Sequence, residues 1–200
     1  VVHETYKDSN GQWLSPAEII VSSENGQRKA ISLADKAPVE IGSIEKMSKS
    51  KRNTVDPDDI IKIYGADAVR WFILSDSPPE RDIQWSDSGI QGAFKYIQKI
   101  WRVCEKIKIY KKEGEKIDNS FLIKTNILIK EITECIEKFH INVAVAKLYV
   151  FLNNINQEIE KQSLNEEDII NAYKKYLIII SAFIPYIANE CWEKITGKQD

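Results

Sequence analysis

Hydrophobic and polar positions follow two different patterns along this chain. Up to about residue 44, apolar residues fall in short runs separated by polar turns, which is typical of β-strands. From residue 56 onward, apolar residues recur at steps of three and four, which is typical of amphipathic helices. The sequence therefore predicts a mixed fold, in which a short β-rich segment precedes an antiparallel α-helical bundle. The predicted strands are 19–21, 30–33 and 39–44, with a tight turn at Asn25-Gly26 between the first two.

Helix boundaries are marked by capping residues and by prolines. Asp56 with Pro57 predicts a helix start, and Gly65 predicts its end. Asp67 is expected to cap the next helix, which the prolines after Ser77 terminate. Further helices are predicted from about 86 to 112, 120 to 139, 142 to 160, and from Asn165 to Gly197 with a break at Pro185, while 111–119 is expected to be a loop.

The predicted helix at 86–112 carries two stripes. Its expected buried stripe is Ile90, Phe94, Ile97, Trp101 and Cys104. A second stripe, which we call the basic stripe, lies roughly 150° around the helix from the first at ~100° per residue. From the residues alone, the basic stripe fits a solvated face as well as a surface for nucleic acid. It consists of Lys95, Lys99, Arg102 and Lys106.

A polar run joins the two patterns. Residues 46–50 read Lys-Met-Ser-Lys-Ser, and Lys51, Arg52 and Asn53 follow. Such a run is unsuited to a core strand or to the buried face of a helix. Lysines, serine hydroxyls and backbone N–H groups are all suited to phosphate oxygens. A solvated loop is the alternative, because short lysine-rich runs are weak signals.

Composition narrows the classes of protein that fit. The net charge of −2 argues against bulk attraction to nucleic acid, so any such contact must come from local patches. The three cysteines lie far apart and only two histidines are present, which argues against a metal site. No signal peptide or membrane-spanning run is visible, and unpaired cysteines fit a reducing compartment, so we expect a cytoplasmic location. The abrupt start in Val1-Val2 suggests a piece of a longer chain.

Residues 46–50 are identical to the signature loop of the class I aminoacyl-tRNA synthetases. Further positions resemble that class: Asn53, Val55, Pro57, Tyr64-Gly65-Ala66-Asp67, Arg70, Phe72, Trp85 and Gly92. Three segments resemble the bacterial leucyl-tRNA synthetases in particular. They are 3–8 with 13–16, 82–89 with Gly92-Ala93, and 139–146. The isoleucine, valine and methionine branches are the alternatives within the class.

This resemblance implies three regions and an activity. Residues 1–55 would end a Rossmann-type catalytic domain and carry a small β insertion at about 9–40. Residues 56–85 would form a helical connector, and 86–200 an anticodon-binding-type helical domain. The implied reaction activates leucine with ATP and transfers it to tRNA(Leu). The parts of the catalytic domain that bind leucine are absent, so the isolated chain is expected to be inactive.

The resemblance also assigns residues. Lys46, Met47, Ser48, Lys49 and Ser50 would form the catalytic loop, with Lys46 and Lys49 contacting ATP phosphates. Lys51, Arg52 and the basic stripe would contact tRNA. Magnesium is expected with ATP, with no metal held by this chain, no membrane partner, and a monomeric state. A non-catalytic tRNA-binding helical module and a purely structural helical protein are the other classes that remain open.

Overall fold

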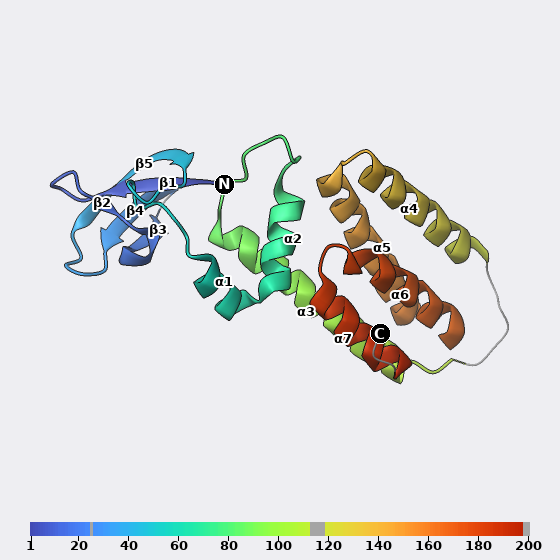
Figure 1. Cartoon of the computed structure of the whole chain (residues 1–200). Coiled ribbons are helices and arrows are strands. Elements are labelled where there is room, and N and C mark those ends of the chain that lie inside the picture. Colours follow the sequence, from blue (N-terminus) through green and yellow to red (C-terminus); the bar gives the residue numbers. More distant parts are fainter. Residues whose placement is uncertain (25, 113–118, 198–200) are drawn as a thin grey trace. The chain divides into compact units, whose positions relative to one another are not determined.

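The computed structural model describes residues 1–24, 26–112 and 119–197 (Figure 1). It divides the chain into two compact units. The first comprises residues 1–63 with 82–87, and the second comprises 64–81 with 88–200.

The first unit is built on a curled antiparallel sheet. Its strands lie in the order β2-β1-β5-β4-β3, and a 3₁₀ turn at Pro16–Glu18 precedes β3. The expected strands are confirmed, and Gly26 takes a positive φ of 79° in the predicted turn, while Asn25 lies outside the described residues. The strands are β1 Val2–Lys7, β2 Trp13–Leu14, β3 Ile19–Glu24, β4 Gln27–Ser32 and β5 Pro38–Lys46.

A small apolar core holds this sheet together. Tyr6, Ile19, Ala30 and Val39 are buried against one another, one from each of four strands. Antiparallel pairing of β1 with β5 places Val2 opposite Lys46, which is the first residue of the polar run. The sheet therefore places the first residues of β1 beside the start of that run.

The predicted start of the first helix is confirmed. Helix α1 spans Pro57–Tyr64, and the Asp58 N–H donates to Asp56 Oδ1 at 2.9 Å. Gly65 ends it with a φ of 82°, a left-handed conformation that glycine adopts without steric cost.

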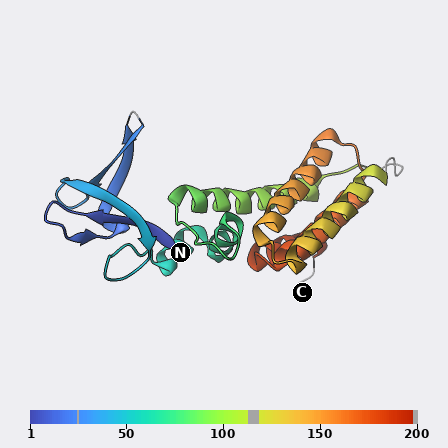
Figure 2. The same ribbon diagram turned by 90° about the horizontal axis from the view of Figure 1, so that it is seen from above.

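The second unit is a bundle of helices (Figure 2). Helix α4 packs against α5, and α6 packs against α7. Figure 1 shows α6 and α7 running in opposite directions. Side chains from α3 join them: the Tyr96 hydroxyl donates to Leu148 O in α5 at 3.1 Å. The expected loop at 111–119 lies mostly outside the described residues. The helices are α2 Ala66–Asp76, α3 Asp87–Ile109, α4 Asn119–Glu137, α5 Ile141–Lys161, α6 Glu166–Ser181 and α7 Pro185–Thr196.

The buried face of α3 differs from the one expected. Ile90 and Cys104 are buried as predicted, but Phe94, Ile97 and Trp101 are only half-buried. The fully buried face includes a small alanine and a tyrosine whose hydroxyl is hydrogen-bonded inside the bundle. Neither residue belongs to the stripe of bulky apolar residues that the sequence pattern predicts. That face is Ala93, Tyr96, Ile100, Val103 and Ile107.

Asp67 has a different role from the predicted one. Gly65 occupies the N-cap of α2, and Asp67 lies inside that helix. Its Oδ2 accepts the Ile187 N–H at 2.7 Å, so it caps α7 instead. Arg70, one turn further along α2, donates from Nε to Phe183 O at 2.7 Å. Helix α2 therefore binds both sides of the turn that joins α6 to α7.

An aromatic cluster fills the centre of the bundle. Trp71 is fully buried, stacks on Tyr96 at a centroid distance of 4.7 Å, and donates from Nε1 to Tyr149 Oη at 2.7 Å. The Tyr96 and Tyr176 hydroxyls are 2.8 Å apart, which satisfies both inside the core. Burial raises the pKa of both tyrosines, so both stay protonated and able to donate.

Candidate functional site

The polar run forms a compact turn between β5 and α1. The Lys51 N–H donates to Ser48 Oγ at 3.3 Å, and the Arg52 N–H donates to Lys49 O at 3.3 Å. Arg52 has a φ of 52°, which is uncommon for a residue with a side chain and marks a sharp change of chain direction. We call residues 46–53 the signature loop from here on.

The two lysines predicted to contact ATP are available for a ligand. Lys46 and Lys49 are exposed, and neither forms an ion pair with any residue that the structure describes. The Ser48 and Ser50 hydroxyls lie 3.3 Å apart on the same side of the turn. Two free cations and two hydroxyls on one short loop are the groups that a polyphosphate requires.

Lys51 and Arg52 are instead engaged within the first unit. Lys51 forms an ion pair with Glu45 of β5. Arg52 pairs with Glu18 at 2.8 Å and donates to Trp13 O at 3.3 Å. Both pairs are partly exposed, so each contributes little to stability and can be exchanged for another anion. Their predicted contact with tRNA remains a prediction.

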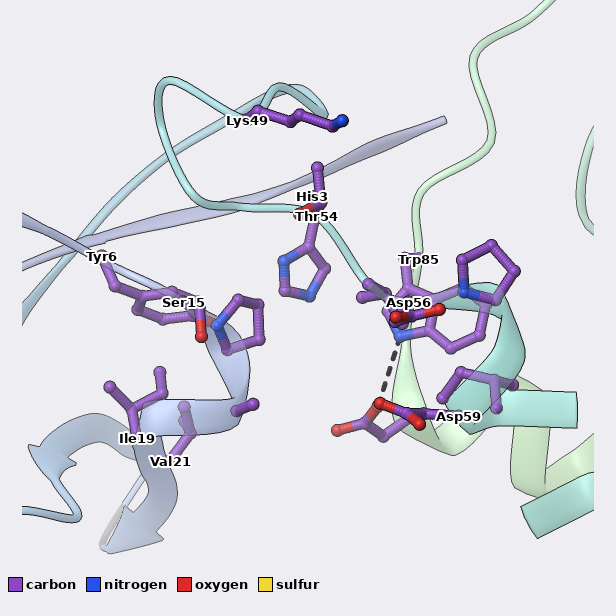
Figure 3. A pocket seen from close by; sticks show the side chains of 16 residues that line it. His3, Tyr6, Ser15, Ile19, Val21, Lys49, Thr54, Asp56, Asp59 and Trp85 are labelled. Carbon is purple, nitrogen blue, oxygen red and sulfur yellow. Dashed lines mark hydrogen bonds between the residues drawn. The ribbon is translucent and has the colours of Figure 1, made fainter. Parts of the chain in front are cut away.

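A groove of about 820 Å³ lies beside the signature loop (Figure 3). Lys49 extends along one edge of it, and the His3 ring points into it. Trp85 and Asp59 line the side opposite Ile19. The lining combines an apolar floor with one cation and several carboxylates, so it offers both stacking and polar contacts to a ligand.

His3 supplies the imidazole that points into this groove. Burial lowers the pKa of its imidazole, although the nearby Glu4 and Asp87 oppose the shift. The ring is therefore mainly neutral at pH 7 and can both donate and accept a hydrogen bond. Its Nδ1 has no partner among the residues that the structure describes. Sequence reasoning did not single out His3 as a site residue, because a single histidine in a strand has no characteristic spacing.

The basic stripe lies on α3, within the second unit. Lys95 and Arg102 are exposed. Lys99 donates to Asn153, and Lys106 contacts Asn156 at 2.9 Å and Glu160 at 3.0 Å. Two of its four cations are thus partly engaged with α5, while the other two face solvent.

Two further properties of the described residues bear on ligands. Within them, no group of three or more histidine, cysteine, aspartate or glutamate side chains is arranged to hold a metal ion. No helix in the same ranges has both the length and the apolar character that spanning a bilayer requires.

Comparison with known proteins finds matches both for the segment that contains the signature loop and for the helical unit. Residues 118–200 match the family described as the anticodon-binding domain of tRNA ligase, and 39–86 match class I tRNA synthetases (I, L, M and V). The leucine–tRNA ligases of Afipia carboxidovorans and Bartonella quintana are each 42% identical to this chain over 99% of its length. The chain belongs to the leucine–tRNA ligase family. It spans 24% of the length of each of these two ligases.

Solved class I synthetases share the fold of this chain. A ternary complex of the Agrobacterium radiobacter K84 agnB2 LeuRS with tRNA and LeuAMS gives a TM-score of 0.66 at 23% identity, covering 76% of this chain and 21% of that chain. The Mycobacterium tuberculosis methionyl-tRNA synthetase with methionyl-adenylate gives 0.61 at 21% identity, covering 74% and 35%. The predicted fold class and the resemblance to the leucine branch are confirmed.

Proposed function

We propose that this chain is the part of a leucine–tRNA ligase that supplies the signature loop for leucine activation and the helices that dock tRNA. The observation that carries the proposal is the exposed pair Lys46 and Lys49 on the signature loop, with Lys49 at the edge of a groove, in a chain 42% identical to leucine–tRNA ligases. The amino-acid pocket would lie in the remainder of the catalytic domain.

The loop would act on the phosphates of ATP. In amino-acid activation the carboxylate attacks the α-phosphate, an acyl-adenylate forms, and pyrophosphate leaves. Negative charge grows on the equatorial oxygens and on the leaving group. Cations that meet these oxygens bind the transition state more tightly than the ground state, which accelerates the reaction. Lys49 and Lys46 would supply that charge, and Ser48 and Ser50 would donate to phosphate or hold the turn.

Magnesium would accompany ATP as part of the substrate. An exposed loop suits amino-acid activation, because the loop can close over ATP and open to release pyrophosphate. The match to leucine–tRNA ligases supports a ligase that uses ATP, leucine and tRNA(Leu). We expect it to act in the cytoplasm as a monomer.

Amino-acid-dependent exchange of pyrophosphate into ATP tests the proposal. The complete ligase that contains this sequence is assayed with leucine, isoleucine, valine and methionine separately. We expect exchange with leucine alone. Exchange with a different amino acid would keep the chemistry of the loop but reject the leucine assignment, and no exchange with any of the four would reject the proposed reaction.

The basic stripe would bind the phosphate backbone of tRNA. Lysine and arginine that neutralise phosphates give affinity without reading sequence. A family match to anticodon-binding domains at 118–200 and the LeuRS complex with tRNA support this partner. Lys95 and Arg102 are the exposed members and are therefore the better candidates.

Replacing Lys95 and Arg102 with alanine should weaken tRNA binding and flatten its salt dependence. Each lost phosphate contact lowers the slope of log K against log salt by about 1. The measurement is tRNA(Leu) affinity of the complete ligase at several salt concentrations. Lys108→Ala is the matched control, because Lys108 is an exposed lysine on the same helix outside the stripe. Equal slopes for the double variant and the control would exclude the stripe from the contact.

A further inference from the structure

Asn53 is a buried side chain within a run of exposed cations. It is fully buried, whereas Lys49, Ser50 and Arg52 are exposed. Its carboxamide contacts three parts of the first unit. Oδ1 accepts the Ser48 N–H at 2.9 Å, and Nδ2 donates to His3 O and Glu45 O, each at 3.3 Å.

These contacts use both ends of the amide. An asparagine side chain offers an acceptor oxygen and two donor hydrogens. The oxygen meets the signature loop, and the nitrogen meets the carbonyls of β1 and β5, including Lys46 O at 3.5 Å. A carboxylate could not donate to those carbonyls, and an apolar side chain would leave them and the Ser48 N–H without this partner. The site therefore specifies an amide.

The amide connects the sheet to the position of Lys49. The Asn53 carboxamide accepts the Ser48 N–H and so holds the backbone directly before Lys49. Asn53 itself directly follows Arg52 in the chain. Within the turn, Lys49 O accepts the Arg52 N–H. Both ends of the short segment that carries Lys49 are thus fixed by one buried side chain, and the lysine lies at the edge of the groove (Figure 3).

We propose that Asn53 is a positioning residue, which holds the signature loop so that Lys49 meets the phosphates of ATP in the transition state. This inference rests on the proposed function. Preorganised charge accelerates a reaction only when it is already in place, and a displacement of about 1 Å can lower a rate by about 100-fold. Asn53 itself touches no reacting atom and acts through the backbone of Ser48.

Asn53→Ala in the complete ligase tests the proposal. We expect kcat for leucine-dependent pyrophosphate exchange to fall by about 10- to 100-fold, with the KM for ATP changing by less than about threefold. Asn10→Ala is the matched control, because Asn10 is an exposed asparagine in the same unit. An unchanged kcat for Asn53→Ala, with exchange intact in the unmodified ligase, would overturn the inference.

A double-variant cycle separates positioning from general stability. If Asn53 acts through Lys49, then Asn53→Ala should have little further effect on kcat in a Lys49→Ala background. Additive losses would mean that Asn53 acts by another route. Should Asn53→Ala not fold, the isosteric Asn53→Asp is used, and its kcat should rise as pH falls, because a protonated carboxyl regains a donor. Failure of both variants to fold would assign Asn53 to folding and reject the positioning role.

Limited trypsin digestion provides a readout that does not depend on activity. The signature loop contains four cleavage sites, Lys46, Lys49, Lys51 and Arg52. Cleavage there requires the loop to open, and its rate follows the population of the open form when opening is fast. We expect Asn53→Ala to be cut at the loop at least about 10-fold faster than Asn10→Ala. If the unmodified ligase shows no exchange, the proposed function is rejected. The digestion tests the loop-holding role separately: equal cutting rates for Asn53→Ala and Asn10→Ala would reject that role.

Discussion

Replacing Lys49 with alanine in the complete ligase will lower the rate of leucyl-adenylate formation by about 100- to 1,000-fold. Removal of one preorganised group that stabilises developing charge typically costs about 2.7–4 kcal/mol of transition-state stabilisation. Lys49 is exposed at the edge of the groove and forms no ion pair with the described residues, so its charge is available to ATP. Single-turnover adenylate formation at saturating ATP and leucine measures the effect.

Two variants make the Lys49 result specific. Lys62→Ala removes an equally mobile cation from α1, where Lys62 faces solvent and pairs with Asp59 at 3.3 Å. It should leave the rate within about threefold of the unmodified ligase. Lys49→Arg keeps the charge but changes its shape, so it should recover part of the rate. A Lys49→Ala rate within threefold of the unmodified ligase would remove Lys49 from the catalytic loop.

Replacing Trp71 with alanine should lower the free energy of unfolding of the helical unit by about 3–5 kcal/mol. Large-to-small changes at fully buried aromatic residues have costs of this size, because a cavity remains where the ring was. Here the indole also stacks on Tyr96 and donates to Tyr149, so the change also removes the donor from the hydroxyl of a half-buried tyrosine.

Urea unfolding followed by helical circular dichroism measures the Trp71 effect. The midpoint should move to lower urea without a change of slope, since the surface exposed on unfolding stays similar. Tyr186→Ala is the control, because Tyr186 is 68% exposed and should change stability by no more than about 0.5 kcal/mol. A Trp71→Ala midpoint equal to that of the control would show that the cluster is not the centre of the unit.

Local signals predicted the secondary structure well. The Asp56-Pro57 start, the glycine end at Gly65, and the Asn165 cap, which accepts the Asp168 N–H at 2.8 Å, are all confirmed. These features depend on residues within four positions of one another, so the chain carries their information locally. The signature loop was predicted for the same reason, as a contiguous run.

Features that depend on distant residues were missed. Asp67 fits the pattern of a local cap, yet the donor it serves is 120 positions away. Asn53 stands in a polar run that predicts exposure, and its burial follows from carbonyls on β1 and β5 that only the folded sheet brings together. The partners of Lys51 and Arg52 are likewise set by tertiary structure, since Glu18 is 34 positions from Arg52.

The contacts of α2 with the α6–α7 turn have a consequence for synthesis on the ribosome. The chain emerges from its N-terminal end, so Asp67 and Arg70 are present long before the backbone groups at 182–187 that they bind. Until those residues emerge, the carboxylate has no donor from α7 and the guanidinium has no acceptor from the turn. A messenger truncated before the codon for Ala182 would remove both sets of partners at once. Its product would therefore keep the contacts of Trp71 with Tyr96 and Tyr149 but lack the anchors of α2 at 182–187 and the Phe183 ring. Such a product would be a target for proteases.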